Sequence, residues 1–237
     1  LDHSGDENAM KNFWSLFWVQ FFGAFNDNVF KNAIVILVTY KSYSLAGLAP
    51  EQVVSLCGGI FILPYFLFST LAGTLSDKFS RLHIVRIVKW LEIAIMILGA
   101  IGFLTENFPL LLIGLFLMGT QSTFFGPAKY STLPEIVGKK DLTRANAYFS
   151  VGTFISILLG TILGGITISL PNNGALITAI IVLLLAVVGT IFSHLFKAYL
   201  PSHPQQKIKI NPFEPLRSVF ARKNPRKDIY FAIFGVS

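Results

Sequence analysis

Residues 175–192 read Ala-Leu-Ile-Thr-Ala-Ile-Ile-Val-Leu-Leu-Leu-Ala-Val-Val-Gly-Thr-Ile-Phe, a run without a single charged side chain. A helix that crosses the ~30 Å hydrocarbon core of a bilayer needs about 20 such residues. Strands of a membrane barrel instead alternate apolar and polar residues over about ten positions. This stretch therefore predicts a membrane-spanning helix and places the chain among all-α membrane proteins.

Five further runs of the same kind lie along the chain. The six predicted spans are Trp14–Tyr40, Val53–Leu75, Ile84–Leu104, Phe108–Gly126, Phe149–Leu170 and Ala175–Lys197. Of the 237 residues, 53% are hydrophobic and 13% are charged, whereas soluble domains carry about 25% charged residues. This composition excludes a soluble enzyme and a disordered chain, and the single cysteine, Cys57, excludes a disulfide scaffold.

The composition divides the chain into four parts. Residues 1–10 are predicted to be an N-terminal tail, either native or left over from cloning, and residues 11–197 the six-span bundle. Residues 198–227 are basic and proline-rich, which favours a cytoplasmic linker, and residues 228–237 begin a seventh apolar run. The sequence thus predicts one complete six-helix bundle and the first turns of another.

The distribution of basic residues predicts the orientation in the membrane. With the N-terminus and the even-numbered connections in the cytoplasm, 17 of the 19 Lys and Arg residues fall on the cytoplasmic side, as the positive-inside rule requires. The net charge of +7 is therefore a sign of topology and not of nucleic-acid binding. The four histidines are scattered, so we expect no metal site and no cofactor.

The first span carries an unusual number of polar residues. At about 100° per residue, Gln20, Asp27 and Lys31 fall on one helix face, and Asn28 and Asn32 extend it. Each ionisable group at the centre of a membrane costs at least ~2.5–3.5 kcal/mol, so this face is expected to line a substrate cavity. Asp27 and Lys31 also have the i,i+4 spacing of an ion pair. The alternative is a buried pair that only fixes the first helix to its neighbours.

A second polar segment separates the second and third spans. It places Gly73 at a predicted helix end, followed by Asp77, Lys78 and Arg81 in a short cytoplasmic turn. This arrangement resembles the loop signature of the major facilitator superfamily. In that family the acid pairs with basic groups and with a helix end in the other half of the transporter. The resemblance therefore implies a conformational latch.

Two more patterns lie in the fourth and fifth spans. Small residues recur at every fourth position of the fifth span, at Gly152, Ser156, Gly160 and Gly164, which lets another helix approach closely. This ridge predicts close helix packing, and also a role in gating where the two halves of a transporter slide on each other.

At the end of the fourth span, Lys129 is expected to reach phosphate headgroups while Tyr130 lies at the interface. The alternative is an ordinary helix end.

Polar residues also occur on the third and fourth spans. Lys89 and Glu92 are three positions apart and are expected to pair, while Gln121 and Ser122 add polar atoms to the fourth span. Asn26 points away from the polar face of the first span.

Three stretches together resemble the bacterial lysophospholipid transporter family, within the major facilitator superfamily. They are Ala24-Phe25-Asn26-Asp27-Asn28, Gly126-Pro127-Ala128-Lys129-Tyr130 and Leu142-Thr-Arg144-Ala-Asn146. The version with Lys31 is most similar to proteins in which the transporter is fused to acyltransferase and acyl-ligase domains, whose motifs this chain lacks. We therefore expect no enzymatic activity from this segment.

The resemblance implies a transporter that moves lysophospholipid, notably lysophosphatidylethanolamine, from the outer to the inner leaflet of the bacterial inner membrane. Asp27 would be the functional acid, and Lys129 and Tyr130 would belong to the cytoplasmic gate or headgroup region. The expected partners are the substrate, membrane lipids, a second six-helix half and an acyltransferase or acyl-ACP synthetase. Two alternatives stay open: a solute or drug/proton antiporter of the same fold, and a membrane platform for an acyltransferase.

Overall fold

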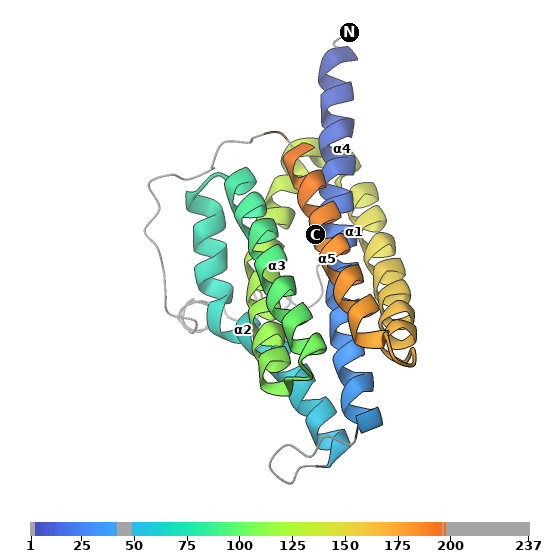
Figure 1. Ribbon diagram of the computed structural model, residues 1–237. Helices are drawn as coiled ribbons and strands as arrows, with labels where there is room; N and C mark the ends of the chain where they lie inside the picture. The colour runs from blue at the N-terminus through green and yellow to red at the C-terminus, as the bar shows by residue number, and fades with distance from the viewer. Residues whose placement is uncertain (1–2, 42–48, 196, 198–237) are drawn as a thin grey trace.

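The computed structural model describes residues 3–41, 49–195 and 197, and every regular element in this part of the chain is an α-helix. The elements are α1 (His3–Lys41), α2 (Pro50–Lys78), α3 (Arg81–Leu104), α4 (Phe108–Ile168) and α5 (Gly174–Leu195). They form an antiparallel bundle in which α4 packs against α1, α2 and α3 (Figure 1). The predicted linker and the predicted start of a seventh span lie outside the described residues.

The helix α4 contains two membrane spans joined at a sharp bend. Gly138 has φ 70° and ψ 171°, a conformation that glycine adopts without the steric cost of a Cβ. The helices on either side, Phe108–Gly138 and Lys140–Ile168, are each long and apolar enough to cross a membrane. With α1, α2, α3 and α5 they give six candidate spans in the described part of the chain, which agrees with the predicted all-α six-helix fold.

The helices that contain the fourth and fifth predicted spans extend beyond those spans. The 22 residues between Gly126 and Phe149 lie outside both predicted spans, but this segment is helical apart from the bend at Gly138. Pro127 and Pro134 lie inside the helix, a position that membrane helices tolerate. Charged residues mark the point where a helix leaves the hydrocarbon and not the point where it ends.

One end of the bundle gathers the N-terminus, the turn between α2 and α3, the bend in α4 and the end of α5 (Figure 1). At the turn, only Phe79 and Ser80 separate α2 from α3. At the opposite end, Asn107 caps α4 by accepting a hydrogen bond from the backbone N–H of Leu110 at 3.1 Å. These short connections fix neighbouring spans as antiparallel hairpins.

The interior consists of two apolar clusters with polar residues between them. The first cluster includes Phe30, Ile34, Met96, Phe103 and Leu115, and the second includes Leu16, Val85, Phe125, Leu133 and Phe149. On α1, α3 and α4 alike, the two clusters are separated by a polar stretch. The buried residues Asn26, Lys89, Glu92 and Gln121 form this polar layer. It crosses α1 near the middle of its candidate span, Glu7–Thr39.

The small residues of the fifth span lie against α1. A Cβ at Gly160 would be 2.7 Å from the carbonyl oxygen of Phe25, and a Cβ at Gly164 would be 3.0 Å from the Cα of Val29 and closer still to its oxygen. Gly152 meets the ring of Phe17 in the same way, and Ser156 between them is fully buried. The two helix backbones therefore approach more closely than larger side chains would allow.

We expect Gly164→Ala to destabilise the protein because the backbone of Val29 cannot move away from the added methyl group. Overpacking of this kind costs about 1–3 kcal/mol. Gly165→Ala is the matched control, since a Cβ there has no atom within 4 Å. The measurement is thermal unfolding of the purified full-length variants in detergent. Equal melting temperatures for the two variants would contradict the close α1–α4 packing.

Candidate functional site

A cavity of about 410 Å³ lies between α1, α2, α3 and both halves of α4. Its polar lining consists of Gln20, Asp27, Asn28, Lys31, Lys89, Gln121, Ser122, Lys129, Tyr130 and Thr153. Its apolar lining includes Val19, Phe61, Tyr65, Phe125 and Ile157. The cavity therefore brings together the polar face predicted on the first span and the motif predicted at the end of the fourth.

Lys129 is buried and lines this cavity. Its Nζ donates a hydrogen bond to Oε1 of Gln20 at 3.0 Å, and Nε2 of Gln20 donates to Thr153 Oγ1 at 3.1 Å. The ammonium also lies 4.2 Å from the ring centroid of Tyr130. Lys129 is buried, whereas Tyr130 is exposed at the rim. The cavity thus contains a cation that is held in place by a neutral amide and an aromatic ring.

The expected ion pair between Asp27 and Lys31 is not formed: within the described residues, no ion pair closer than 4 Å joins them. Asp27 Oδ2 instead accepts a hydrogen bond from Ser122 Oγ at 2.9 Å, and the ammonium of Lys31 lies 5.5 Å from the ring centroid of Phe61 on α2. Neighbouring helices thus draw the two side chains apart. Asp27 Oδ1 is buried and has no hydrogen-bond partner among the described residues.

The two asparagines on the same face of α1 contribute less to the cavity. Nδ2 of Asn28 donates to the carbonyl oxygen of Ala24 at 2.8 Å. Nδ2 of Asn32 donates to the carbonyl oxygen of Asn28 at 2.9 Å and to Thr161 Oγ1 at 3.2 Å. Asn28 lines the cavity, whereas Asn32 is not among its lining residues.

The polar layer extends from the cavity into the centre of the bundle. Lys89 and Glu92 form an ion pair, as their spacing predicted. Glu92 also accepts hydrogen bonds from Asn26 Nδ2 and Gln121 Nε2, both at 3.0 Å. The glycine at position 189 of α5 makes room for the lysine, because a Cβ there would lie 2.7 Å from Lys89 Nζ.

Ser122 joins the cavity to the polar layer. Its Oγ lies 2.9 Å from Asp27 Oδ2 and 3.1 Å from Gln121 Oε1, and Gln121 in turn contacts Glu92. A chain of polar contacts therefore connects the half-buried acid of the cavity with a fully buried one. The sequence around Ser122 and Gln121 shows only that the fourth span carries polar atoms, because nothing local to these residues indicates which helices they face.

The predicted latch residues lie at the end of the bundle that holds the N-terminus. Gly73 is inside α2 and not at its end, because the helix continues through Asp77 and Lys78. Arg81, the first residue of α3, pairs with Glu135 of α4, within this six-helix half. Asp77 makes no hydrogen bond or ion pair with another described residue. Its pairing with a second half stays a prediction.

A family model described as the Major Facilitator Superfamily matches residues 16–237. The chain belongs to the Major Facilitator Superfamily. It is therefore a multi-pass membrane protein of a transporter superfamily whose members are typically not enzymes.

Individual relatives are 28% identical to this chain over the residues that match. One is the lysophospholipid transporter LplT of Photorhabdus laumondii subsp. laumondii, matched over 73% of this chain and 40% of its own length. Another is the quinolone resistance protein NorB of Staphylococcus aureus, matched over 69% of this chain and 32% of its own length. The chain thus spans well under half the length of these relatives.

Proposed function

We propose that the protein moves a lysophospholipid such as lysophosphatidylethanolamine from the outer to the inner leaflet of the bacterial inner membrane. The observation that carries this proposal is the cavity in which an acid, Asp27, and a base, Lys129, face the same space. A phosphoethanolamine headgroup has one anionic and one cationic part. Lys129 would bind the phosphate, and Asp27 Oδ1, which has no partner among the described residues, would accept from the ammonium.

The rest of the cavity lining suits the single acyl chain. Phe61 and Tyr65 of α2 and Phe125 and Ile157 of α4 give apolar walls beside the charged groups. Outside the cavity, α2 presents exposed apolar side chains such as Phe66. A lysophospholipid could therefore place its headgroup among the polar residues while its chain lies along apolar surface.

Alternating access gives the movement a mechanism. In transporters built from two halves, substrate sites lie near the bilayer midplane and the halves rock about them. The cavity and the polar layer lie near the middle of α1, which fits such a site. A second six-helix half would complete the cavity, and Asp77, Lys78 and Arg81 would act as a latch at the cytoplasmic end. An acyltransferase or acyl-ACP synthetase would use the delivered lipid.

A drug/proton antiporter is the second candidate, because the quinolone resistance protein NorB has the same 28% identity to the matched part of this chain as the lysophospholipid transporter. In that case Asp27 would exchange a proton and not bind an ammonium. The deciding experiment measures uptake of labelled lysophosphatidylethanolamine into spheroplasts alongside quinolone resistance, with and without the full-length protein. Uptake without resistance supports our proposal, and resistance without uptake overturns it. Capture of an acyltransferase without lipid movement would favour a docking role.

We expect Lys31→Leu to reduce lysophospholipid uptake by no more than about fivefold, the upper size of a weak charge–charge interaction. Its ammonium lies against Phe61 and not against Asp27, so its loss leaves the acid in place. Initial uptake rates at several lipid concentrations measure the effect. A loss as large as that of Asp27→Ala would show instead that Lys31 contacts the substrate.

A further inference from the structure

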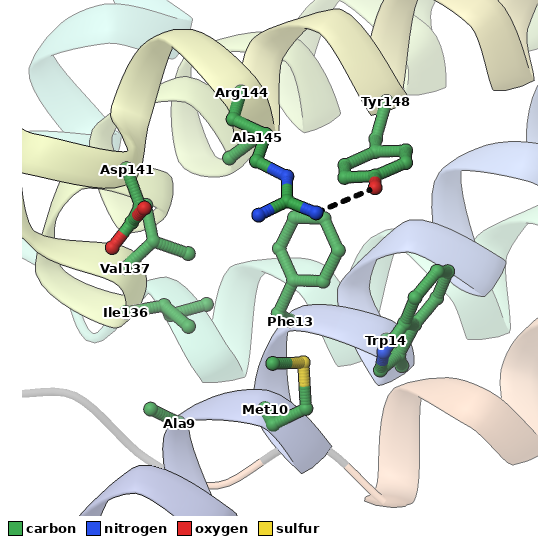
Figure 2. Close-up of a pocket in the computed structure, with 10 residues that line it drawn as sticks. All are labelled: Ala9, Met10, Phe13, Trp14, Ile136, Val137, Asp141, Arg144, Ala145 and Tyr148. Carbon is green, nitrogen blue, oxygen red and sulfur yellow. Dashed lines mark hydrogen bonds between the residues drawn. The ribbon is translucent and has the colours of Figure 1, made fainter.

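A second pocket, of about 590 Å³, lies at the end of the bundle that holds the N-terminus (Figure 2). One side is formed by Met10, Phe13 and Trp14 of α1, and the other by residues of α4 on both sides of the bend. Arg144 and Asp141 lie on the α4 side. The proposed transport mechanism gives this pocket no role.

The two charged residues in this pocket are not neutralised by each other. Nη2 of Arg144 donates to the hydroxyl of Tyr148 at 3.3 Å, and the guanidinium lies 5.7 Å from the Tyr148 ring centroid. No ion pair within 4 Å joins Arg144 to Asp141, and among the described residues Asp141 has no hydrogen-bond partner. Figure 2 shows the guanidinium between Asp141 and Tyr148, above the ring of Phe13. Both charges are therefore available to a ligand.

Aromatic rings separate this pocket from the central cavity. The ring of Phe149 lies 5.8 Å from that of Phe13, which lines the pocket. The centroid of the same Phe149 ring lies 5.9 Å from the ammonium of Lys129, which lines the cavity. The ring of Phe17 packs edge-on against that of Phe149, with 5.9 Å between the ring centroids. Both spaces thus lie along the same seam between α1 and α4, one on each side of Phe149.

We propose that the second pocket binds the headgroup of a zwitterionic phospholipid and is the release-side station of the transported lipid. Arg144 binds the phosphate, since guanidinium offers paired donors to phosphate oxygens, and Asp141 accepts from the ammonium. Trp14 and Tyr148 suit the membrane interface, and Phe13 and Met10 contact the acyl chain. Asp141 disfavours lipids whose headgroup is only anionic. This assignment rests on the proposed function for its place in transport.

Photolabelling tests the proposal. Full-length protein in phosphatidylglycerol nanodiscs is labelled with lysophosphatidylethanolamine that carries a photoreactive acyl chain, and labelled peptides are mapped by mass spectrometry. We expect labels both around the central cavity and around Met10 and Trp14. Arg144→Gln should lower the second set at least about tenfold, the usual loss for a hydrogen bond to a charged group, and leave the first set unchanged. Lys11→Gln, an exposed basic residue outside the pocket, is the control and should change neither.

Two further variants make the outcome decisive. Arg144→Lys keeps the charge and should retain part of the labelling, which excludes misfolding as the cause. Asp141→Asn should remove the preference for lysophosphatidylethanolamine over a lysophosphatidylglycerol competitor. Central labels without labels near Met10, or labels there that ignore Arg144, would overturn the second station and leave the proposed function standing. Pocket labels without central labels or uptake would instead contradict the proposed function.

Discussion

Uptake of lysophosphatidylethanolamine should fall about 10- to 100-fold when Asp27 is replaced by alanine, the range expected when a buried charged partner of a ligand is removed. Asp27 is the one acid that lines the central cavity within the described chain. One of its oxygens is held by Ser122, and the other has no partner there. Substitution would leave the ammonium of the headgroup without an acceptor. Initial rates of labelled lipid uptake into spheroplasts give the measurement.

Asn32→Ala is the control for this effect. Asn32 lies one helical turn beyond Asn28 on the same helix, but it does not line the cavity, so uptake should stay near that of the unaltered protein. Membrane abundance is measured for both variants, so that loss of protein is not mistaken for loss of transport. Normal lipid uptake by Asp27→Ala, together with loss of quinolone resistance, would reject lipid transport in favour of an antiporter.

Stability should fall by about 3–5 kcal/mol in Glu92→Ala, the usual cost of leaving one member of a buried ion pair without its partner. Lys89 and Glu92 are both almost fully buried. Removal of the carboxylate leaves the ammonium of Lys89 without its ion-pair partner. It also removes the acceptor of the hydrogen bonds that Asn26 and Gln121 donate. Reversible unfolding in mixed detergent micelles measures the loss, and low abundance in the membrane would accompany it.

The double variant Glu92→Ala with Lys89→Met tests the reason for this loss. Because it buries no charge, it should recover much of the stability, as replacement of a whole buried pair by apolar residues often does. If the double variant is no more stable than Glu92→Ala, the loss of stability comes from lost packing and not from an unpaired buried charge. A single variant as stable as the unaltered protein would show that water reaches Lys89.

The helices could be predicted from the sequence because few backbone structures are stable inside a bilayer. Every backbone polar group must be satisfied inside hydrocarbon, so long apolar runs become helices. The inward face of α1 was also predictable, since Gln20 and Asp27 are separated by about two helical turns. The segment 127–148 was not, because polarity there reflects the depth in the membrane and says nothing about whether the backbone remains helical.

The hydrogen-bond partners of the polar side chains could not be predicted from the sequence. Spacing on one helix suggested that Asp27 pairs with Lys31, yet its hydrogen-bond partner is Ser122, 95 positions away. Likewise Asn26 bonds to Glu92, 66 positions away. Spacing reports which residues share a helix, and only the arrangement of helices determines which of them meet.

The polar layer also constrains how the protein enters the membrane during synthesis. α1 is among the least hydrophobic of the six candidate spans, and the polar side chains of Asn26 and Asp27 find their partners on α3 and α4. Until those helices have been made, the first span would expose unsatisfied amide and carboxyl groups to lipid, at a cost of several kcal/mol. We therefore expect the retention of the first span in the membrane to depend on helices translated after it, so that at least four spans integrate together.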